Sequence, residues 1–272
     1  MDEVRVLVKD ELSQVEQSLS ELIKEENIVY TNLKHFLMSK SKRIRSILCI
    51  LYLKANNADI TEDLLSLLIA GELIHNASLI HDDIIDSSEL RRNEESLYKK
   101  FGSKLGVLLG DFLLSIAVEK LVSINNSEIS NAFLNTTKIM SDAEIRQFIN
   151  RDNNITIEEY LNIIEGKTAS LFSVILKSAA ILSGLNTEQA ENFGKLFGII
   201  FQINNDLTSE SIKNDRTNGI KTAYEILGIE KTIALKDNYK EEIRRVIANS
   251  PNEKYKKGIE DLVDLLWLIK KN

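Results

Sequence analysis

Proline is almost absent from this chain, and this constrains its fold more than any other single feature. Pro251 is the one proline among 272 residues, and only eleven glycines accompany it. Proline breaks helix interiors and glycine weakens them, so almost nothing in the sequence prevents long helices. Apolar residues recur with a helical period along most of the chain, and no convincing alternating strand or hairpin interrupts them.

The periodicity predicts a series of helices joined by short connections. We expect them at residues 2–25, 43–56, 61–86, 104–124, 128–149, 157–183, 188–207, 219–228, 238–249 and 254–270. No internal repeat, low-complexity tract or linker divides the series. The sequence therefore predicts an all-α fold, a large single-domain helical bundle spanning residues 1–272 with ligand groups projecting inward into a central cavity.

Charge and composition exclude some classes of function. The net charge of −7 and a pI near 5.2 argue against nucleic acid as a partner, because nucleic-acid binding usually requires a basic face. The single cysteine, Cys49, cannot form an intrachain disulfide and fits a reducing compartment. The charged amino terminus lacks a signal-peptide core, and no uncharged apolar run is long enough to span a bilayer. We therefore expect a cytoplasmic protein with no transmembrane segment.

An aspartate-rich segment, HDDIID at residues 81–86, ends the longest apolar stretch. On a helix Asp82 and Asp86 share one face and Asp83 lies beside them. Carboxylates this close repel one another unless a cation joins them, and oxygen ligands suit Mg²⁺, which often binds through one or two carboxylates plus phosphate oxygens. The pair Arg91–Arg92 follows and offers bidentate donors for a phosphate. The segment predicts a magnesium-bridged diphosphate site.

An isolated motif of this kind has an ordinary alternative, a solvated helix end with surface ion pairs. The preceding residues 73–80 are mostly apolar or small, which predicts a buried helix. Carboxylates on a buried helix need a partner, and a metal ion is the simplest one.

Further groups carry chemistry suited to a diphosphate. They are the basic cluster Lys42, Arg43 and Arg45, then His75, then Lys167 and Thr168, and finally Gln202, Asn205, Asp206 and Ser209. The basic cluster precedes an apolar helix, whose amino terminus favours phosphate. Taken alone, each group has an ordinary alternative, namely a solvated turn, a core histidine, a lysine that snorkels to solvent, or a helix end that runs into a loop.

In combination and in order, these motifs resemble the trans-type isoprenyl diphosphate synthases, also called polyprenyl synthetases. The resemblance covers about residues 38 to 225 and is nearest to the medium- and long-chain, octaprenyl-like members. The family's Gly-Gly-Lys-Arg-x-Arg-Pro segment is represented by Lys42, Arg43 and Arg45, with Lys40, Ser41 and Ser46 in place of the glycines and the proline. The Asp-rich motif with its arginine pair, His75, Gly110–Phe112, Lys167–Thr168 and Phe201–Gln202 also occur at matching places.

The resemblance implies an activity, a cofactor and residue roles. Members of the family use Mg²⁺ to join isopentenyl diphosphate to an allylic prenyl diphosphate in an all-helical, usually homodimeric bundle, which gives a longer all-trans polyprenyl diphosphate. By this resemblance Lys42, Arg45, His75 and Arg92 would bind isopentenyl diphosphate, while Arg91, Lys167, Thr168 and Gln202 would hold the allylic side. The metal set would be Asp82, Asp83, Asp86, Asn205, Asp206 and Ser209, and the catalytic set would be Asp82, Asp83, Asp86, Lys167, Thr168 and Gln202.

The second motif departs from the family pattern. Where the family has Asp-Asp-x-x-Asp, this chain has NDLTS at residues 205–209, so only Asp206 keeps its carboxylate. The loss should weaken one metal site. NDLTS also resembles the start of the metal motif of class I terpene synthases, although Lys213 stands where that motif has glutamate. Two alternatives stay open: a terpene synthase-like enzyme that ionises an allylic diphosphate, and a low-activity or non-catalytic subunit that binds diphosphates or an active partner.

Two residues bear on product length by the same resemblance. Ser78 and Ala77, four and five residues before the first aspartate, are small and would leave the product tunnel open. The resemblance therefore favours a medium or long prenyl product, and it leaves room for transient membrane contact during product release.

Overall fold

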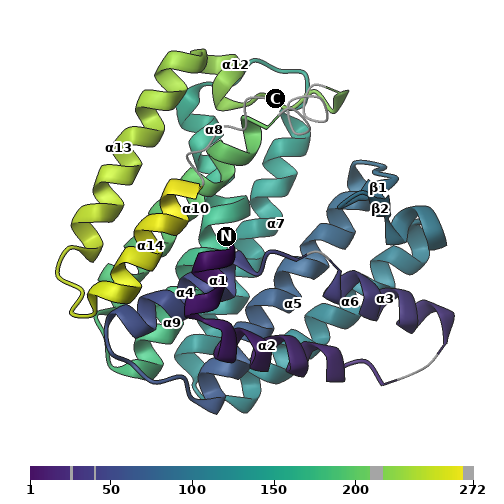
Figure 1. The fold of residues 1–272 in the computed structure, drawn as a ribbon. Coiled ribbons are helices and arrows are strands. Elements are labelled where there is room, and N and C mark those ends of the chain that lie inside the picture. Colours follow the sequence, from purple (N-terminus) through teal and green to yellow (C-terminus); the bar gives the residue numbers. More distant parts are fainter. Residues whose placement is uncertain (25–26, 40, 209–216, 266–272) are drawn as a thin grey trace. The chain divides into compact units, whose positions relative to one another are not determined.

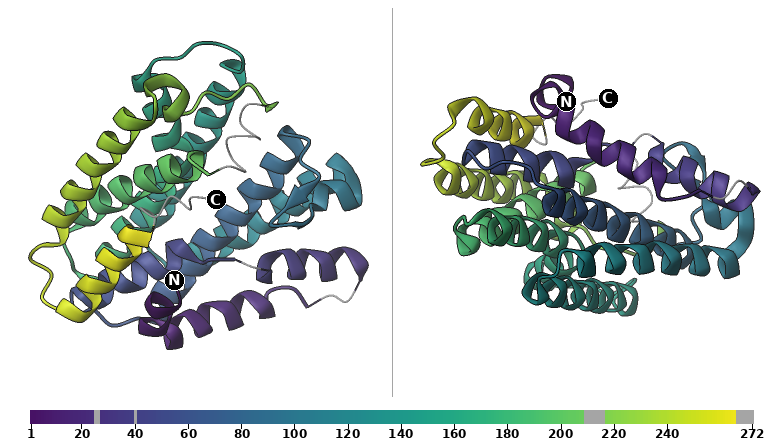
Figure 2. Two further views of the ribbon diagram at one scale, coloured as in Figure 1. Left: turned by 45° about the horizontal axis from the view of Figure 1, so that its top comes forward. Right: turned by 90° about the horizontal axis from the view of Figure 1, so that it is seen from below.

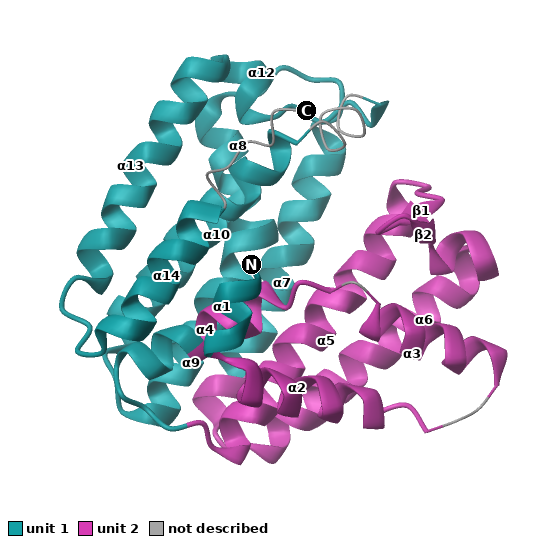
Figure 3. Ribbon diagram, in the orientation of Figure 1, with its two compact units in different colours: residues 1–7, 51–59, 131–272 teal, residues 8–50, 60–130 magenta. Residues whose placement is uncertain are grey.

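The computed structural model describes residues 1–24, 27–39, 41–208 and 217–265, and the described chain is almost entirely helical (Figure 1). The all-α prediction is therefore confirmed. The chain forms two compact units (Figure 3). Unit 1 comprises residues 1–7, 51–59 and 131–272, and unit 2 comprises residues 8–50 and 60–130. The single domain spanning residues 1–272 stays a prediction.

Unit 2 is built around two long helices that lie side by side, α5 and α6 (Figures 1 and 2). Its elements are α2 (Lys9–Glu21), α3 (Ile28–Met38), the first part of α4 (Ile44–Ala55), α5 (Glu62–Ile85), the strands β1 (Leu90–Arg91) and β2 (Glu94–Glu95), α6 (Leu97–Ser123) and the start of α7 (Ser127–Ile149). The two strands pair antiparallel and form a short hairpin between α5 and α6.

Unit 1 is centred on α9 and α10, which also lie side by side. Its elements are α1 (Asp2–Leu7), the ends of α4 and α7, α8 (Ile157–Ile164), the π-helical turn η1 (Glu165–Ala169), α9 (Ser170–Ser183), α10 (Thr187–Asp206), α12 (Ala223–Leu227), α13 (Ile229–Ile247) and α14 (Glu253–Leu265). A core cluster of this unit packs α8 and η1 against α10 and α12, and its buried members are Tyr160, Ile164, Ala169, Ile199, Ile203 and Ala223.

Polar side chains fix where the helices begin. Thr61 accepts from the Leu64 amide at the start of α5, and Asn27 accepts from the Val29 and Tyr30 amides at the start of α3. Such caps satisfy amides that have no partner inside the helix. Thr156 and Glu159 form a reciprocal capping box at α8, so α3, α5 and α8 each have a defined start.

Most of the predicted helices are confirmed, but several bounds differ and some elements were missed. Helix α6 begins at Leu97 rather than 104, α13 begins at Ile229 rather than 238, and α12 covers only Ala223–Leu227 of the predicted 219–228. Residues 266–270 of the last predicted helix lie outside the described residues. The predicted helix 2–25 is divided into α1 and α2 at Val8. Helix α3 and the β1–β2 hairpin were not predicted. The hairpin exists because Arg92 and Asn93 both adopt positive φ, at 55° and 65°, which turns the chain back between the two strands.

Helix α5 is mostly buried inside unit 2. Among the described residues it is the one helix long and apolar enough to cross a bilayer, but 67% of its apolar window is buried in the fold. Its buried face explains the high hydropathy without a membrane. The same burial brings the polar residues Glu72, Asn76 and Asp83 into the interior of the unit.

The predicted helix 157–183 is continuous but contains one π-helical turn, η1, which carries Lys167 and Thr168. Such turns are rare and occur often at functional sites. Helix α10 packs tightly against this turn at Gly198, where an added Cβ would come within 2.4 Å of Ala169 Cα. The glycine therefore permits a backbone approach that fixes η1 against α10.

Candidate functional site

A cluster of arginines surrounds His75 in unit 2. Arg43 and Arg45 come from the start of α4 and are only 2% and 8% exposed. Burial lowers the pKa of Arg45 to about 10, although the nearby carboxylate of Glu72 opposes this shift. Burial and the charges of Arg45, Arg92, Arg91 and Arg43 together hold the pKa of His75 well below its ordinary value, so His75 is neutral at pH 7.

One buried carboxylate organises part of this cluster. Glu72 on α5 is 1% exposed and accepts a hydrogen bond from Arg43 Nη1 at 3.2 Å and another from Ser46 Oγ at 2.7 Å. Arg43 Nη2 also donates to the Leu37 carbonyl at 2.6 Å. A buried charge must be paired and hydrogen-bonded, and both oxygens of Glu72 meet this requirement.

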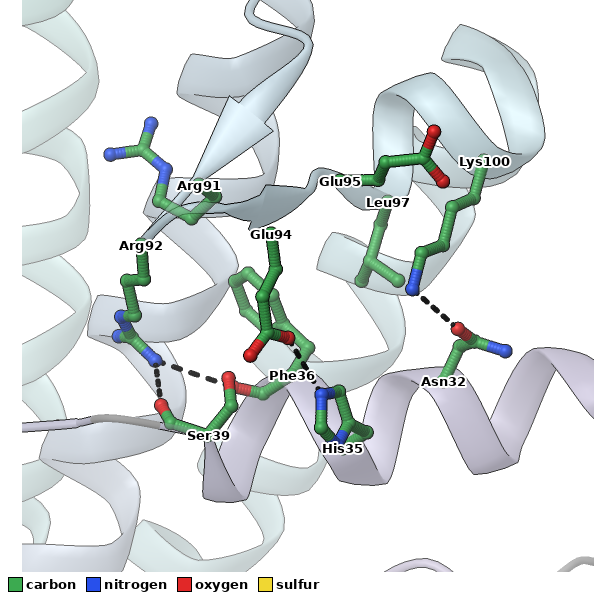
Figure 4. Close-up of a pocket in the computed structure, with 10 residues that line it drawn as sticks. All are labelled: Asn32, His35, Phe36, Ser39, Arg91, Arg92, Glu94, Glu95, Leu97 and Lys100. Atoms are coloured by element: carbon green, nitrogen blue, oxygen red, sulfur yellow. Dashed lines mark hydrogen bonds and ion pairs between the residues drawn. The ribbon is translucent and has the colours of Figure 1, made fainter.

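Arg92 lies against the end of α3 (Figure 4). Its Nη1 donates to the carbonyls of Ser39 at 2.8 Å and Phe36 at 3.3 Å, and its guanidinium carbon lies 5.6 Å from the centre of the Phe36 ring. The last carbonyls of a helix lack partners within it, so a cation is favourable there. Burial lowers the pKa of Arg92. Arg91 points the opposite way in the same view.

Arg91 is paired with the middle aspartate of the Asp-rich motif. Its Nε donates to Asp83 Oδ1 at 2.9 Å, and Nη2 also contacts this oxygen. The Asp83 side chain is 1% exposed, and burial raises its pKa, which Arg91 opposes. Asp82 and Asp86 lie on one face at the end of α5, where the Asp86 amide donates to the Asp82 carbonyl. Both are half-buried, unlike Asp83.

In unit 1 a chain of hydrogen bonds joins three helical elements. Thr168 Oγ1 on η1 donates to Gln202 Oε1 at 2.8 Å, and Gln202 Nε2 donates to Asp206 Oδ1 at 2.7 Å. The Tyr160 hydroxyl of α8 donates to Asp206 Oδ2 at 2.5 Å. Burial raises the pKa of Asp206 to about 6, although these donors and Lys167 favour its charged form.

Lys167 is held by two residues of α7. Its Nζ pairs with the Glu144 carboxylate and donates to Gln147 Oε1 at 2.8 Å. The side chains of Lys167 and Glu144 are 26% and 15% exposed, so the pair is partly shielded from water. The charge of Lys167 also lowers the pKa of Asp206, which places Lys167 near the chain of hydrogen bonds from Thr168 through Gln202 to Asp206.

Comparison with known proteins decides the family. The polyprenyl synthetase family model matches residues 26–260. The chain belongs to the polyprenyl synthetase family. It is 36% identical over 207 residues to a prenyl transferase of Cyanidium caldarium, a match covering 74% of this chain and 64% of that protein. It is 28% identical to the octaprenyl diphosphate synthase of Escherichia coli over 216 residues, or 76% of this chain and 65% of that protein. The matches thus span less than two thirds of these two relatives.

A solved structure shares the fold of this polyprenyl synthetase family member. The polyprenyl synthase of Caulobacter crescentus complexed with calcium and isoprenyl diphosphate aligns with a TM-score of 0.90 and 22% identity, covering 97% of this chain and 96% of that one. At this identity the likeness establishes the fold alone.

The structure brings together part of the predicted site in each unit. In unit 2 Arg45, His75, Arg91 and Arg92 form one cluster, and Lys42 is exposed beside Arg43. In unit 1 Lys167, Thr168, Gln202 and Asp206 form another, and Asn205 is the half-buried neighbour of Asp206. Ser209 lies outside the described residues. The assigned roles of these residues stay predictions.

The Asp-rich motif at residues 82–86 is better suited than the motif at residues 205–209 to a metal ion that is held jointly by protein carboxylates and a diphosphate. Within the described residues no three acidic, histidine or cysteine side chains gather closely enough to hold a metal ion by themselves. Mg²⁺ often takes one or two carboxylates and completes its shell with water and phosphate, and Asp82 with Asp86 suits that mode. Asp83 also has a buried Oδ2 without a hydrogen-bond partner. At the second motif both oxygens of Asp206 already accept hydrogen bonds.

Sequence reasoning missed several residues that hold the predicted ones in place. They are Glu72, Glu144, Gln147 and Tyr160. Glu72 had a signal, because a lone carboxylate in the middle of an apolar helix needs a buried partner. Glu144 and Gln147 are half-buried on α7 and Tyr160 lies in the core, and the partners of all three depend on tertiary packing that no local pattern marks.

Proposed function

We propose that the protein is a prenyltransferase that joins isopentenyl diphosphate to an allylic prenyl diphosphate and yields a longer all-trans polyprenyl diphosphate. One observation carries the proposal: in a polyprenyl synthetase family member, four arginines gather around His75 in the same unit as the Asp-rich motif. Paired guanidinium groups suit diphosphate oxygens, and a neutral histidine can donate a hydrogen bond to an anion.

The reaction requires stabilisation of the departing diphosphate's charge and a cavity that excludes water, and it requires no nucleophilic side chain. The allylic C–O bond breaks, the isopentenyl double bond attacks the allylic carbon to form a C–C bond, and a proton then passes to the released diphosphate. Arg45, His75 and Arg92, with Lys42, bind isopentenyl diphosphate. The role on the allylic side that the family resemblance gives to Arg91, Lys167, Thr168 and Gln202 is kept in this proposal, because preorganised donors stabilise the charge of a departing diphosphate.

Asp82 and Asp86 would hold Mg²⁺, with Asp83 orienting Arg91. When bound, the metal supplies Lewis-acid stabilisation of the departing diphosphate. The solved Caulobacter relative complexed with calcium and isoprenyl diphosphate supports a divalent cation of the oxygen-binding class.

In this proposal turnover is slower than in an enzyme with two complete Asp-rich motifs. The reason is that Asn205 is neutral and both oxygens of Asp206 accept hydrogen bonds, from Tyr160 and Gln202. The same observation keeps the second candidate in view, a subunit that binds diphosphates or an active partner with little turnover. A terpene synthase-like enzyme is the third candidate, since NDLTS at residues 205–209 begins like its metal motif.

One incubation separates these candidates. Purified protein is mixed with Mg²⁺, farnesyl diphosphate and radiolabelled isopentenyl diphosphate, and products are extracted and resolved by chain length. We expect elongated prenyl diphosphates. Hydrocarbons formed without isopentenyl diphosphate would indicate a terpene synthase, and no product with any allylic primer would reject the prenyltransferase and favour a binding subunit.

Exposed apolar side chains support a homodimer in this proposal. On α6 they are Val107, Leu108, Val118 and Val122, and on one face of α7 they are Leu134, Ile145, Phe148 and Ile149, while the exposed Ile139 of α7 lies off that face. Each set follows one helix face at roughly helical spacing, and apolar stripes of this kind are typical of association surfaces. Light scattering after size exclusion tests it: we expect twice the monomer mass for the wild type and a monomer for Ile145→Glu.

The product is of medium or long chain in this proposal. Ala77 is fully buried on α5 and Ser78 is half-buried, with its hydroxyl turned back to the His75 carbonyl. Two small residues one turn before Asp82 leave room for a growing chain, which is the support for an open tunnel.

A further inference from the structure

Glu72 is a carboxylate placed inside a cationic cluster without facing a ligand. Ser46 Oγ donates to its Oε1 at 2.7 Å, and Arg43 Nη1 donates to its Oε2 at 3.2 Å. The Arg43–Glu72 pair is almost completely buried, with side chains 1% and 2% exposed. Because both oxygens are already used by the start of α4, the carboxylate acts on neighbouring side chains rather than on a substrate or metal.

Arg43 extends this connection to the end of α3. Its Nη2 donates to the Leu37 carbonyl at 2.6 Å, while its backbone adopts the left-handed region with φ of 49°. A residue with a Cβ adopts this conformation at a cost, so surrounding contacts must hold it there. The end of α3 also receives Arg92, through the Phe36 and Ser39 carbonyls. Two arginines thus converge on one helix end, and Glu72 holds the first of them.

The charge of Glu72 also reaches the two arginines assigned to the isopentenyl side. Burial lowers the pKa values of both Arg45 and Arg92, the charges of Arg43 and Arg91 lower that of Arg92 further, and the Glu72 carboxylate raises both. Removing that charge would leave several buried guanidinium groups facing one another with less compensation, and like charges in a poorly solvated region repel strongly.

We propose that Glu72 is the positioning residue of the arginine cluster: by holding Arg43 and Ser46 it fixes the start of α4, and so fixes where Arg45 and Arg92 present their donors to a diphosphate. The inference rests on the proposed function, because it concerns the binding of the same substrates. Glu72 touches neither substrate nor metal.

A positioning role and a purely electrostatic role for Glu72 predict opposite changes in diphosphate affinity when its charge is removed. A carboxylate near an anion site repels the anion, so if Glu72 contributed only its charge, Glu72→Gln would bind a diphosphate more tightly. If Glu72 positions the arginines, the same variant binds it more weakly despite the lost repulsion. Glutamine keeps the size of the side chain, so the comparison isolates the charge and its geometry.

The probe is inorganic pyrophosphate in the presence of EDTA, titrated by calorimetry into the full-length protein, so that the metal takes no part. We expect Glu72→Gln to weaken pyrophosphate binding about tenfold, equal to about 1.4 kcal/mol. In steady-state assays with Mg²⁺ the KM for isopentenyl diphosphate should rise by a similar factor, while kcat at saturation changes by less than about threefold. Glu62→Gln removes the same charge from the exposed first turn of α5 and should leave both values unchanged.

Two further variants keep the test decisive. Glu72→Asp retains the charge with a shorter reach and should recover part of the affinity. Ser46→Ala removes one neutral hydrogen bond, which is a mild enough change to serve if Glu72→Gln does not fold, and it should weaken pyrophosphate binding by about threefold. Unchanged or tighter binding in Glu72→Gln, or in Ser46→Ala where that variant stands in, would overturn the inference. If the wild type formed no prenyl product at all, the proposed function itself would fail.

Discussion

Asp83, the middle aspartate of the Asp-rich motif, forms an ion pair with Arg91 and so orients that arginine. Arg91 Nε lies 2.9 Å from Asp83 Oδ1, and the aspartate is almost completely buried. Asp82 and Asp86 are more exposed on the neighbouring face. The three carboxylates are therefore not equivalent, and their substitutions should have different effects.

Asp83→Asn should raise the KM for the allylic diphosphate about tenfold, because Arg91 loses the charge that orients it. Asp82→Asn should instead raise the Mg²⁺ concentration needed for half-maximal activity, because it removes a carboxylate oxygen suited to the metal. Steady-state assays over a Mg²⁺ series, with each substrate varied in turn, distinguish the two effects. Equal dependence of both variants on Mg²⁺ would contradict the separate roles.

Tyr160→Phe should destabilise unit 1 by ~1–3 kcal/mol, because it leaves the buried Asp206 Oδ2 without its hydroxyl donor. Thermal denaturation followed by circular dichroism measures the loss. Tyr224 is half-buried and makes no hydrogen bond through its hydroxyl in the described structure, so Tyr224→Phe is the matched control and should change the midpoint little. A shift of equal size in both variants would show that the contact with Asp206 contributes nothing.

The helical period was enough to predict most of the fold. Low proline content and apolar spacing located α4, α5, α7 and α10 within one or two residues. The period also placed Asp82 and Asp86 on one face. Such predictions succeed because they depend on local geometry alone.

The elements that were not predicted, α3 and the β1–β2 hairpin, depend on contacts that the helical spacing of apolar residues does not reveal. Helix α3 is short, and its clearest signal was a single capping residue, Asn27. The β1–β2 hairpin requires Arg92 to adopt positive φ, which its residue type does not favour. Because that hairpin carries Arg91 back to Asp83, the partner of the middle aspartate could not be predicted from helix geometry.

Lys236→Met should stabilise the protein near pH 7, and the gain should shrink as the pH rises. Lys236 on α13 is 1% exposed, and its Nζ donates to Asn204 Oδ1 at 3.0 Å. Burial lowers its pKa to about 8, against about 10.4 in the unfolded chain. Protonation therefore favours the unfolded state, so the wild type loses stability as the pH falls from about 10.4 to about 8 and regains it as the pH rises over the same range. Urea denaturation of both proteins at pH 7 and pH 10 measures the difference, and a pH-independent gap would contradict the assigned cause.

Ala77→Phe should shorten the prenyl product. Ala77 is fully buried on α5, one turn before Asp82, so an aromatic ring there would occupy space needed by a growing chain. Chain-length analysis of the extracted products measures the effect, and Ser78→Ala, which keeps the neighbouring position small, should leave the length unchanged. Wild-type product length in a folded Ala77→Phe protein would refute the tunnel assignment.

Gly198→Ala should destabilise unit 1, although alanine normally favours a helix over glycine by about 1 kcal/mol. An added Cβ at Gly198 would lie 2.4 Å from Ala169 Cα, a backbone atom of η1 that cannot rotate away. At Gly106 the nearest atom is the tip of the Ile84 side chain at 2.8 Å, which can move, so Gly106→Ala should be the milder change. Because η1 carries Thr168, a displaced turn should also break its hydrogen bond to Gln202. We therefore expect Gly198→Ala to lower both the unfolding midpoint and the affinity for the allylic diphosphate, and an effect no larger than that of Gly106→Ala would mean that η1 tolerates displacement.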